Sequence, residues 1–99
     1  MSAIIEDLFN KIKTHKGIEV IITCDSEGVP IKSNLDDENK TYLISTAVST
    51  AVKKFNSAVK DITEEELKFI RIRTKTNEIM ISYETDFIFI VIQNPSSNN

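Results

Sequence analysis

The chain has 99 residues, a formal net charge of −3, 40% hydrophobic residues and 27% charged residues, which is typical of one soluble globular domain with a single core. Acidic and basic residues are mixed along the chain, which argues against nucleic-acid binding, because that activity draws its affinity from a clustered basic surface. The sequence has only two glycines and two prolines, which also excludes a collagen-like or low-complexity protein. We expect one domain over residues 1–99.

The cysteine content and the apolar runs indicate the compartment. Cys24 is the sole cysteine, so no intramolecular disulfide can form, and secreted domains this small usually need one. The N-terminus lacks the charged-then-apolar layout of a signal peptide. The longest apolar run, Phe87–Ile92, is far shorter than the ~20 residues that span a bilayer. These features predict a cytoplasmic protein without membrane insertion.

The first third of the chain predicts a helix followed by a hairpin. Apolar residues at spacings of three and four predict a short amphipathic helix over Ala3–Thr14. The β-branched segment Ile18–Thr23 predicts a strand, and Asp25–Gly28 has the composition of a turn. Val29–Ser33 predicts a second strand. Pro30 places that strand at a sheet edge, because proline cannot donate to a ladder.

A long periodic segment follows, with apolar residues on more than one side. It predicts a helix over Lys40–Val59. One apolar row contains Leu43, Ala47, Ala51 and Ala58, and the adjoining row contains Ile44, Val48, Val52, Phe55 and Val59. A helix that buries one face shows a stripe a little over ~100° wide, and this one is broader. Either the second row is simply core, or the helix contacts a second surface besides its own sheet.

The last third of the chain predicts three strands, Leu67–Arg73, Glu78–Tyr83 and Phe87–Ile92. The last of them is apolar on both faces, which is typical of a central strand covered on each side. Pro95 should end it, and residues 96–99 should form a disordered tail. The element order α-β-β-α-β-β-β then predicts an α+β fold with an antiparallel sheet between helices.

No group of residues in the sequence predicts catalysis. His15 is the only histidine, so a zinc site or a histidine-dependent triad lacks its other members. Cys24 lies beside Asp25, and a carboxylate disfavours a reactive thiolate. The acidic runs at 36–38 and 64–66 lack the framing of a calcium loop, and two glycines are too few for a phosphate-binding motif. We predict no enzyme activity, no cofactor and no metal.

Three short segments resemble one family. Glu27–Ser33 is similar to the hairpin of roadblock-type (LC7) dynein light chains. Phe69–Lys75, followed by Asn77–Met80, is similar to the next hairpin, and Ile90–Pro95 is similar to the family's terminal strand. The resemblance extends over about residues 5–95, with the segments in the same order and in the matching elements.

The resemblance implies a roadblock, profilin-like fold: a five-stranded antiparallel sheet with the long helix on one face and the first helix on the other. It also implies a homodimer in which the third strands pair and the long helices lie side by side. The implied function is that of a non-catalytic light chain of the dynein motor, which binds the dynein intermediate chain and supports cargo attachment and microtubule-based transport. Such a protein would be associated with the cytoskeleton or with the axoneme of cilia.

A second branch of the family gives the alternative function. Archaeal and bacterial relatives act as scaffolds or regulators of small GTPases, and they often carry an additional C-terminal helix. The sequence ends shortly after Pro95, which favours the dynein branch.

The residues themselves also favour a dimer. The strand Leu67–Arg73 would present an apolar edge that natural proteins avoid exposing, and a two-fold axis would cover two such edges at once. Arg71 and Arg73 share a face with Phe69. Either this is simply an exposed face of an edge strand, or, as the resemblance favours, it lies at the dimer seam, where a cross-strand pair with Glu78 would contribute about 0.2–1 kcal/mol. The predicted interface consists of Val48, Val52, Phe55, Val59, Leu67, Phe69, Arg71 and Arg73.

The first helix should leave part of the sheet uncovered. Twelve residues make a helix of only ~18 Å, whereas five strands lie ~4.8 Å apart. An apolar surface beside that helix should therefore stay open. We expect an amphipathic segment of the dynein intermediate chain to dock there as a helix in a groove.

Overall fold

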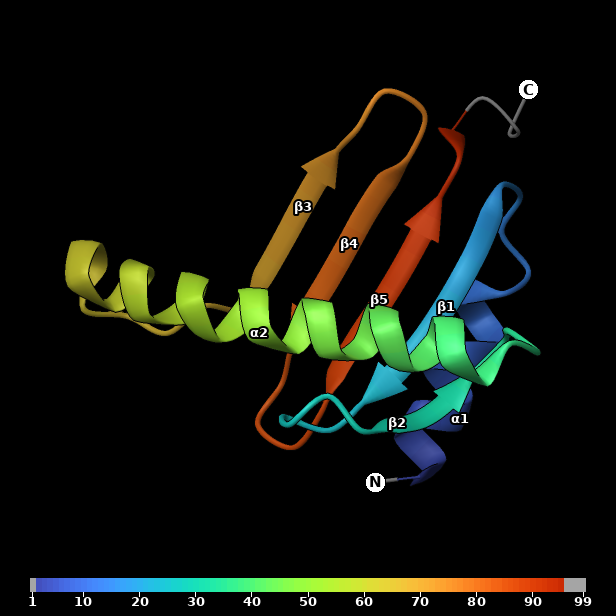
Figure 1. Ribbon diagram of the computed structural model, residues 1–99, viewed down its shortest axis with the longest axis horizontal. Helices are drawn as coiled ribbons and strands as arrows, with labels where there is room; N and C mark the ends of the chain where they lie inside the picture. The colour runs from blue at the N-terminus through green and yellow to red at the C-terminus, as the bar shows by residue number, and fades with distance from the viewer. Residues whose placement is uncertain (1, 96–99) are drawn as a thin grey trace.

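The computed structural model describes residues 2–95 (Figure 1). Its elements are α1 (Ser2–Ile12), β1 (Ile18–Cys24), β2 (Pro30–Ser33), α2 (Glu38–Thr63), β3 (Phe69–Arg73), β4 (Glu78–Tyr83) and β5 (Ile88–Gln93). The strands form one antiparallel sheet in the order β2-β1-β5-β4-β3. The predicted element order and fold class are confirmed, and the tail predicted at 96–99 lies outside the described residues.

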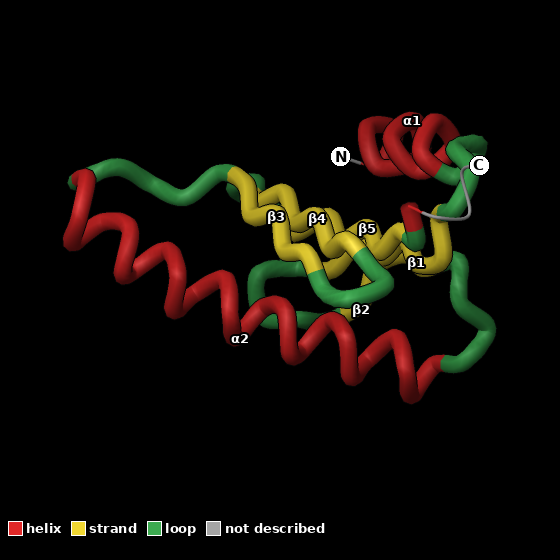
Figure 2. The backbone as a smooth tube through the Cα atoms, turned by 90° about the horizontal axis from the view of Figure 1, so that it is seen from above, coloured by secondary structure: helices red, strands yellow, loops and turns green. Residues whose placement is uncertain are grey.

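The molecule has three layers. Figure 2 shows the sheet between the two helices, with α1 on one side and α2 on the other. Successive strand residues point to opposite faces, so the sheet contributes to two separate apolar cores. The core under α2 contains Val20, Ile22, Cys24, Val52, Ile81, Ile88 and Ile90, and the core under α1 contains Phe9, Ile21, Phe87, Phe89 and Val91.

The centre and one edge of the sheet follow the predictions. β5 lies in the middle, between β1 and β4, and its first four residues are buried. A strand with covered faces needs apolar side chains on both sides, as this one has. β2, which contains Pro30, lies at an edge, where the missing N–H of proline breaks no ladder bond.

β3 forms the other edge and is shorter than predicted. The sequence indicated a strand over Leu67–Arg73, but the ladder begins with Phe69 opposite Ser82. The backbone N–H of Leu67 instead donates to the Asn56 side-chain oxygen at 2.9 Å. This bond ties Leu67 to α2, and the first backbone bond to β4 is the one that Lys68 accepts from the Tyr83 N–H at 2.9 Å.

The helix bounds also differ from the predicted ones. α2 extends beyond Lys40–Val59 at both ends: the Asp37 side chain caps its N-terminus by accepting from the Lys40 N–H at 3.1 Å, and Glu64, with φ 63°, ends it. The last turns of α2 project past β3 (Figure 1). α1 ends at Ile12, before the predicted Thr14. Neither helix in the described part of the chain is both long and apolar enough to cross a membrane.

Gly28 allows α2 to lie close against the β1–β2 hairpin. Its φ is +87°, and a Cβ at this position would lie 3.0 Å from Ser49 Oγ and 3.1 Å from both the Ser45 carbonyl oxygen and Thr46 Cα. The N-terminal half of α2 contacts the hairpin through short side chains, and Thr41, Ser45 and Ser49 are buried. A larger residue at Gly28 would push against helix backbone that cannot rotate away.

We expect Gly28→Ala to lower the free energy of unfolding by about 2 kcal/mol, from strained positive φ and from overpacking against α2. Urea unfolding followed by circular dichroism measures the change. Gly17→Ala is the matched control, since Gly17 also has positive φ (82°) but lies in the α1–β1 connection. Equal losses in the two variants would show that the close approach of α2 contributes nothing.

Candidate interaction surfaces

α2 carries an apolar stripe that its own sheet does not cover completely. The stripe residues recur at alternating spacings of four and three, the pattern with which one helix packs along another. Phe55 is 52% exposed and Ile62 is 80% exposed, and the last turns of α2 project past β3 (Figure 1). The α2 stripe consists of Ile44, Val48, Ala51, Phe55, Ala58 and Ile62.

The structure divides the predicted interface residues among three environments. Val52 is 0% exposed and belongs to the protomer's own core. Val48, Val59 and Leu67 are half-buried along α2 and the start of β3. The remaining four side chains, Phe55, Phe69, Arg71 and Arg73, are exposed. Whether the exposed and half-buried residues meet a second copy remains a prediction.

The predicted residues of β3 lie on the opposite face from α2. Ile70 packs against the α2-side core. Phe69 and Arg71 flank it along the strand, so they point to the α1 side. The predicted interface residues of α2 and those of β3 therefore lie on opposite faces of the sheet. The two groups come near each other only at the edge formed by β3. Among residues 2–95, no strand pairs with the outer side of β3.

The cross-strand pair predicted for the arginines forms within one chain. The Arg71 guanidinium donates to the Glu78 carboxylate at 2.8 Å, and Arg73 lies 3.6 Å from the same carboxylate. The hydrogen bond from Arg71 lowers the pKa of Glu78. Glu78 is half-buried, but both arginines are exposed to solvent, so the contact contributes little stability. Its main effect is to hold β3 in register with β4, and its place at a dimer seam remains a prediction.

An apolar groove lies beside α1, as the sequence predicted for an incompletely covered sheet. Two adjoining cavities of about 290 and 410 Å³ form it, and Ile12, Ser82 and Phe89 line both of them. Ile4 and Leu8 continue the wall formed by α1. The sheet supplies the floor and the far wall, with Phe69, Met80, Phe87 and Val91. We call this feature the α1 groove.

A smaller apolar cluster lies at the other end of the sheet, and the sequence analysis missed it. Ile31 on β2 and Tyr42 on α2 are exposed and line a cavity of about 350 Å³. Val29 and Leu43 are also exposed. Val29 and Ile31, which flank Pro30, could have indicated this surface, because one edge of β2 has no neighbour among the described strands to cover it.

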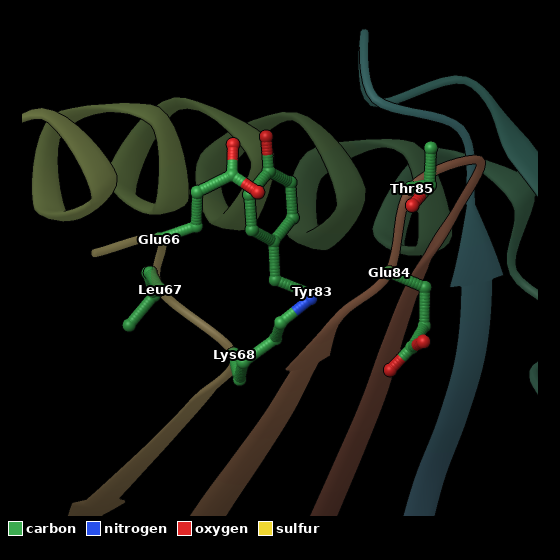
Figure 3. A pocket seen from close by; sticks show the side chains of 6 residues that line it. All are labelled: Glu66, Leu67, Lys68, Tyr83, Glu84 and Thr85. Atoms are coloured by element: carbon green, nitrogen blue, oxygen red, sulfur yellow. The ribbon is translucent and has the colours of Figure 1, made fainter.

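A third hollow, of about 200 Å³, lies where the chain enters β3 and is lined mostly by polar residues. Figure 3 shows the Glu66 and Tyr83 side chains pointing toward α2, whereas Glu84 points the other way. The two carboxylates therefore do not face each other as an acid–base pair would. Within residues 2–95 there is also no group of three or more histidine, cysteine, aspartate or glutamate side chains placed to hold a metal ion.

Cys24 is a free, buried thiol in the core under α2. Burial and, to a smaller extent, the neighbouring Asp25 carboxylate raise its pKa from 9.0 to about 11. A thiol with such a pKa stays protonated at neutral pH and is a poor nucleophile.

The raised pKa makes stability depend on pH in the alkaline range. The folded state holds the thiol proton more tightly than the unfolded state, so this contribution is complete below pH 9.0 and is lost as pH rises through about 11. We expect the free energy of unfolding to fall over that window by more in the wild type than in Cys24→Ala. Urea unfolding at each pH measures both, and identical curves would contradict the prediction.

The comparisons with known proteins agree with this architecture. The model of the Roadblock/LC7 domain family matches residues 4–94. The gliding protein MglB from Thermus thermophilus superposes with a TM-score of 0.78 at 7% identity, over 92% of this chain and 71% of that chain. A structure described as MglB with tetrameric arrangement gives 0.79 at 7% identity, over the same shares. MglB of Myxococcus xanthus gives 0.77 at 16% identity, over 88% and 72%.

At these identities the structural similarity shows the fold alone, whereas the family model covers nearly the whole chain. The helices, the strand order and the short segments that resembled roadblock proteins all lie within the matched residues or at their ends. The chain therefore belongs to the Roadblock/LC7 domain family.

Proposed function

We propose that the chain is a non-catalytic scaffold of the roadblock type that self-associates and regulates a small GTPase by binding it. The observation that carries the proposal is the unpaired edge of β3 beside the exposed α2 stripe. Exposed edges of this kind are rarely left open in natural proteins. An apolar helix stripe with coiled-coil spacing is likewise suited to another helix.

Both features suit a two-fold homodimer. Antiparallel pairing of two β3 strands would continue the sheet from one protomer into the next, and it would satisfy both edges with one axis. Because α2 projects past β3, the same operation would bring the two α2 stripes side by side. The tetrameric arrangement named for MglB shows that one protein of this fold self-associates, which supports the proposal.

The assignment of a small GTPase as partner rests on the family. Bacterial and archaeal roadblock proteins regulate such GTPases, and the structures that resemble this chain include bacterial MglB proteins. A paired dimer would also present a two-fold surface much wider than one protomer, and standard protein interfaces bury about 800 Å² on each partner. A cytoplasmic location is part of the proposal, since small GTPases act there.

The test is a binding titration of the purified chain against the small GTPases encoded in the same genome. Each GTPase is loaded with GDP or with a non-hydrolysable GTP analogue, and biolayer interferometry measures affinity. We expect one GTPase to bind with a preference for one nucleotide and to lose about tenfold or more in affinity when Phe55→Glu removes the dimer. Absence of binding by every GTPase in both states would overturn the proposal.

Dynein light-chain activity is the second candidate, and the α1 groove favours it. The groove is apolar and lies alongside a helix, so it fits an amphipathic segment such as one from a dynein intermediate chain. Immobilised segments of a dynein intermediate chain are included in the same titration, and they distinguish the dynein function from the GTPase function. Binding to these segments, with no GTPase bound, would assign the chain to the dynein motor and place it at the cytoskeleton.

A further inference from the structure

A group of exposed apolar side chains lies at the edge of the sheet opposite β3. Val29 and Ile31 belong to the β1–β2 hairpin, and Tyr42 and Leu43 belong to the first turns of α2; all four are exposed. Ile31 and Tyr42 line the cavity of about 350 Å³ between β2 and α2, which lie side by side in Figure 1. Apolar residues that gather in this way often mark a binding surface. We call these four residues the β2–α2 patch.

The outer edge of β2 is unsuited to another strand. Pro30 has no N–H to donate to a ladder. The β1–β2 ladder also passes from Lys32 to Pro30 in one step of β1, so Ile31 is the extra residue of a bulge. Prolines and bulges protect edge strands from pairing, whereas β3 has continuous register and contains no proline. A partner at the β2–α2 patch must therefore bind through side chains.

The cavity beside β2 is suited to an apolar side chain. Its hydroxyl groups are already hydrogen-bonded: Ser33 Oγ and Thr41 Oγ1 share a bond of 3.1 Å, and the Leu35 N–H donates to Ser33 Oγ at 3.0 Å. Ile31 and Tyr42 supply apolar walls. A volume of about 350 Å³ is near the lower limit of the ~300–1,000 Å³ of small-molecule sites. It fits the single large side chain that anchors many protein interfaces.

The segments around the cavity are held in place by contacts within the chain. The Asn34 side chain accepts from the Ile21 N–H at 2.8 Å and donates to the Glu19 carbonyl oxygen at 3.2 Å, which fixes the connection from β2 to α2. Lys53 of α2 pairs with Glu27 of the hairpin turn at 2.8 Å. A surface that is ordered in this way loses little conformational entropy when a partner binds.

The surface around the patch is acidic. Residues 25–42 contain five acidic residues and two lysines, a formal charge of −3 that equals the charge of the whole chain. Lys32 is directed to the α1 face, where it pairs with Glu6 at 2.8 Å. Asp36 is exposed and Glu38 lines the cavity, and neither forms an ion pair within residues 2–95. A ligand of complementary charge is therefore basic.

A second copy of the chain does not supply this ligand. Its exposed segment of suitable composition is Phe69 with Arg71 and Arg73, and the proposed dimer covers β3. β2 and β3 form opposite edges of the sheet, so the β2–α2 patch stays open at each end of such a dimer. The ligand must come from a different protein.

We propose that the β2–α2 patch binds a basic segment of a partner protein, in which one large apolar side chain enters the cavity and a neighbouring arginine pairs with Asp36 and Glu38. The same arginine can stack on the exposed Tyr42 ring, because a guanidinium is attracted to an aromatic face. The inference goes beyond the proposed function, and it rests on that function only for the assignment of β3 to the dimer.

The experiment is a selection from a displayed library of random peptides against the full chain, followed by affinity measurements on one synthesised peptide at low and high salt. We expect the selected peptides to share a large apolar residue beside arginine or lysine. Affinity should fall as the salt concentration rises, because salt screens the attraction between the peptide and the acidic surface.

Two variants of the patch test the site, and each has a matched control. Ile31→Ser and Asp36→Lys should each weaken the peptide about tenfold or more, and Asp36→Lys should also reduce the dependence on salt. The controls lie on α1, on the other face of the sheet (Figure 2). Ile4→Ser shortens a side chain of similar exposure, and Asp7→Lys makes the same change of charge. Both should leave affinity unchanged.

Sedimentation of the same variants separates this inference from the proposed function, because Ile31→Ser and Asp36→Lys should still self-associate. If they dissociate the assembly, the patch joins copies of the chain and the inference is wrong. Acidic peptides, peptides insensitive to both patch variants, or a failure to select any peptide would also overturn it. Basic peptides that bind a monomeric chain through the patch would support the inference while the proposed self-association fails.

Discussion

Phe55→Glu is expected to leave the protomer folded and to weaken self-association about 100-fold or more, because a carboxylate at an apolar contact loses its water without gaining a partner. Phe55 lies in the middle of the α2 stripe and is 52% exposed in the protomer, so its replacement disturbs the proposed interface rather than the core. Sedimentation equilibrium measures the dissociation constant, and circular dichroism verifies the fold.

The matched control is Ser57→Glu. Ser57 is also exposed, and two residues turn a helix by about 200°, so it lies on the far side of α2 from the stripe. It adds the same charge to the same helix. If both variants weaken self-association equally, net charge rather than the stripe controls assembly; if neither does, the α2 stripe is not the interface.

Val52→Asp is expected to prevent folding. Val52 lies only three residues from Phe55 but is 0% exposed, packed with Ile22 and Ile90 between α2 and the sheet. An unpaired carboxylate at such a site costs several kcal/mol, a large fraction of the ~5–15 kcal/mol that holds a domain together. Circular dichroism and urea unfolding measure the loss.

Val52→Ala keeps the second prediction testable if the aspartate variant yields no folded protein. It should lower the free energy of unfolding by about 1.5–3 kcal/mol without changing the dissociation constant of the dimer. A folded, monomeric Val52→Asp protein would place Val52 at the interface and contradict the packing described above.

The contrast between Val52 and Phe55 shows why the sequence could not separate core from surface on α2. Periodicity indicated two apolar rows, but not which of them faces the sheet. Part of the buried face of α2 is polar, because Thr41, Ser45 and Ser49 let the helix approach the hairpin at Gly28. A pattern of apolar residues alone cannot reveal a close contact made through small hydroxyl side chains.

The strands were more predictable than the surfaces they carry. The apolar character of β5 indicated its central place, and Pro30 indicated the β2 edge; both are confirmed. The period of two also grouped Phe69 with the arginines. It could not show that they face α1, since alternation fixes which residues share a face but not which layer covers it.

The helix ends account for two features that were missed. Ile62 lies beyond the predicted end of the long helix at Val59, so neither predicted row contained it. The observed α2 stripe instead combines Ala51 and Ala58 of one predicted row with Ile44, Val48 and Phe55 of the other. The open sheet beside α1 was predicted and is confirmed, but the second row of α1, which contains Ile4 and Leu8, was not separated from the first. Helices this short give few turns from which to distinguish two neighbouring rows.

The short segments that resemble roadblock proteins contain residues with roles in the fold. They therefore identify the family, but they do not identify the partner. Gly28 permits the close approach of α2, Arg71 pairs with Glu78, and Ile90 belongs to the central strand. In this chain these residues serve the fold, so they carry little information about the partner. Function depends on the surfaces built upon the fold, and the choice between a GTPase and a dynein partner lies there.

Self-association is the claim on which both candidate functions depend, and sedimentation equilibrium of the wild-type chain tests it most directly. The protomer has a mass of 11.2 kDa. We predict that the measured mass approaches twice this value at micromolar concentrations, with Phe55→Glu remaining at the protomer mass over the same range. A wild-type protein that stays at 11.2 kDa at every concentration would contradict the roles given to the β3 edge and the α2 stripe.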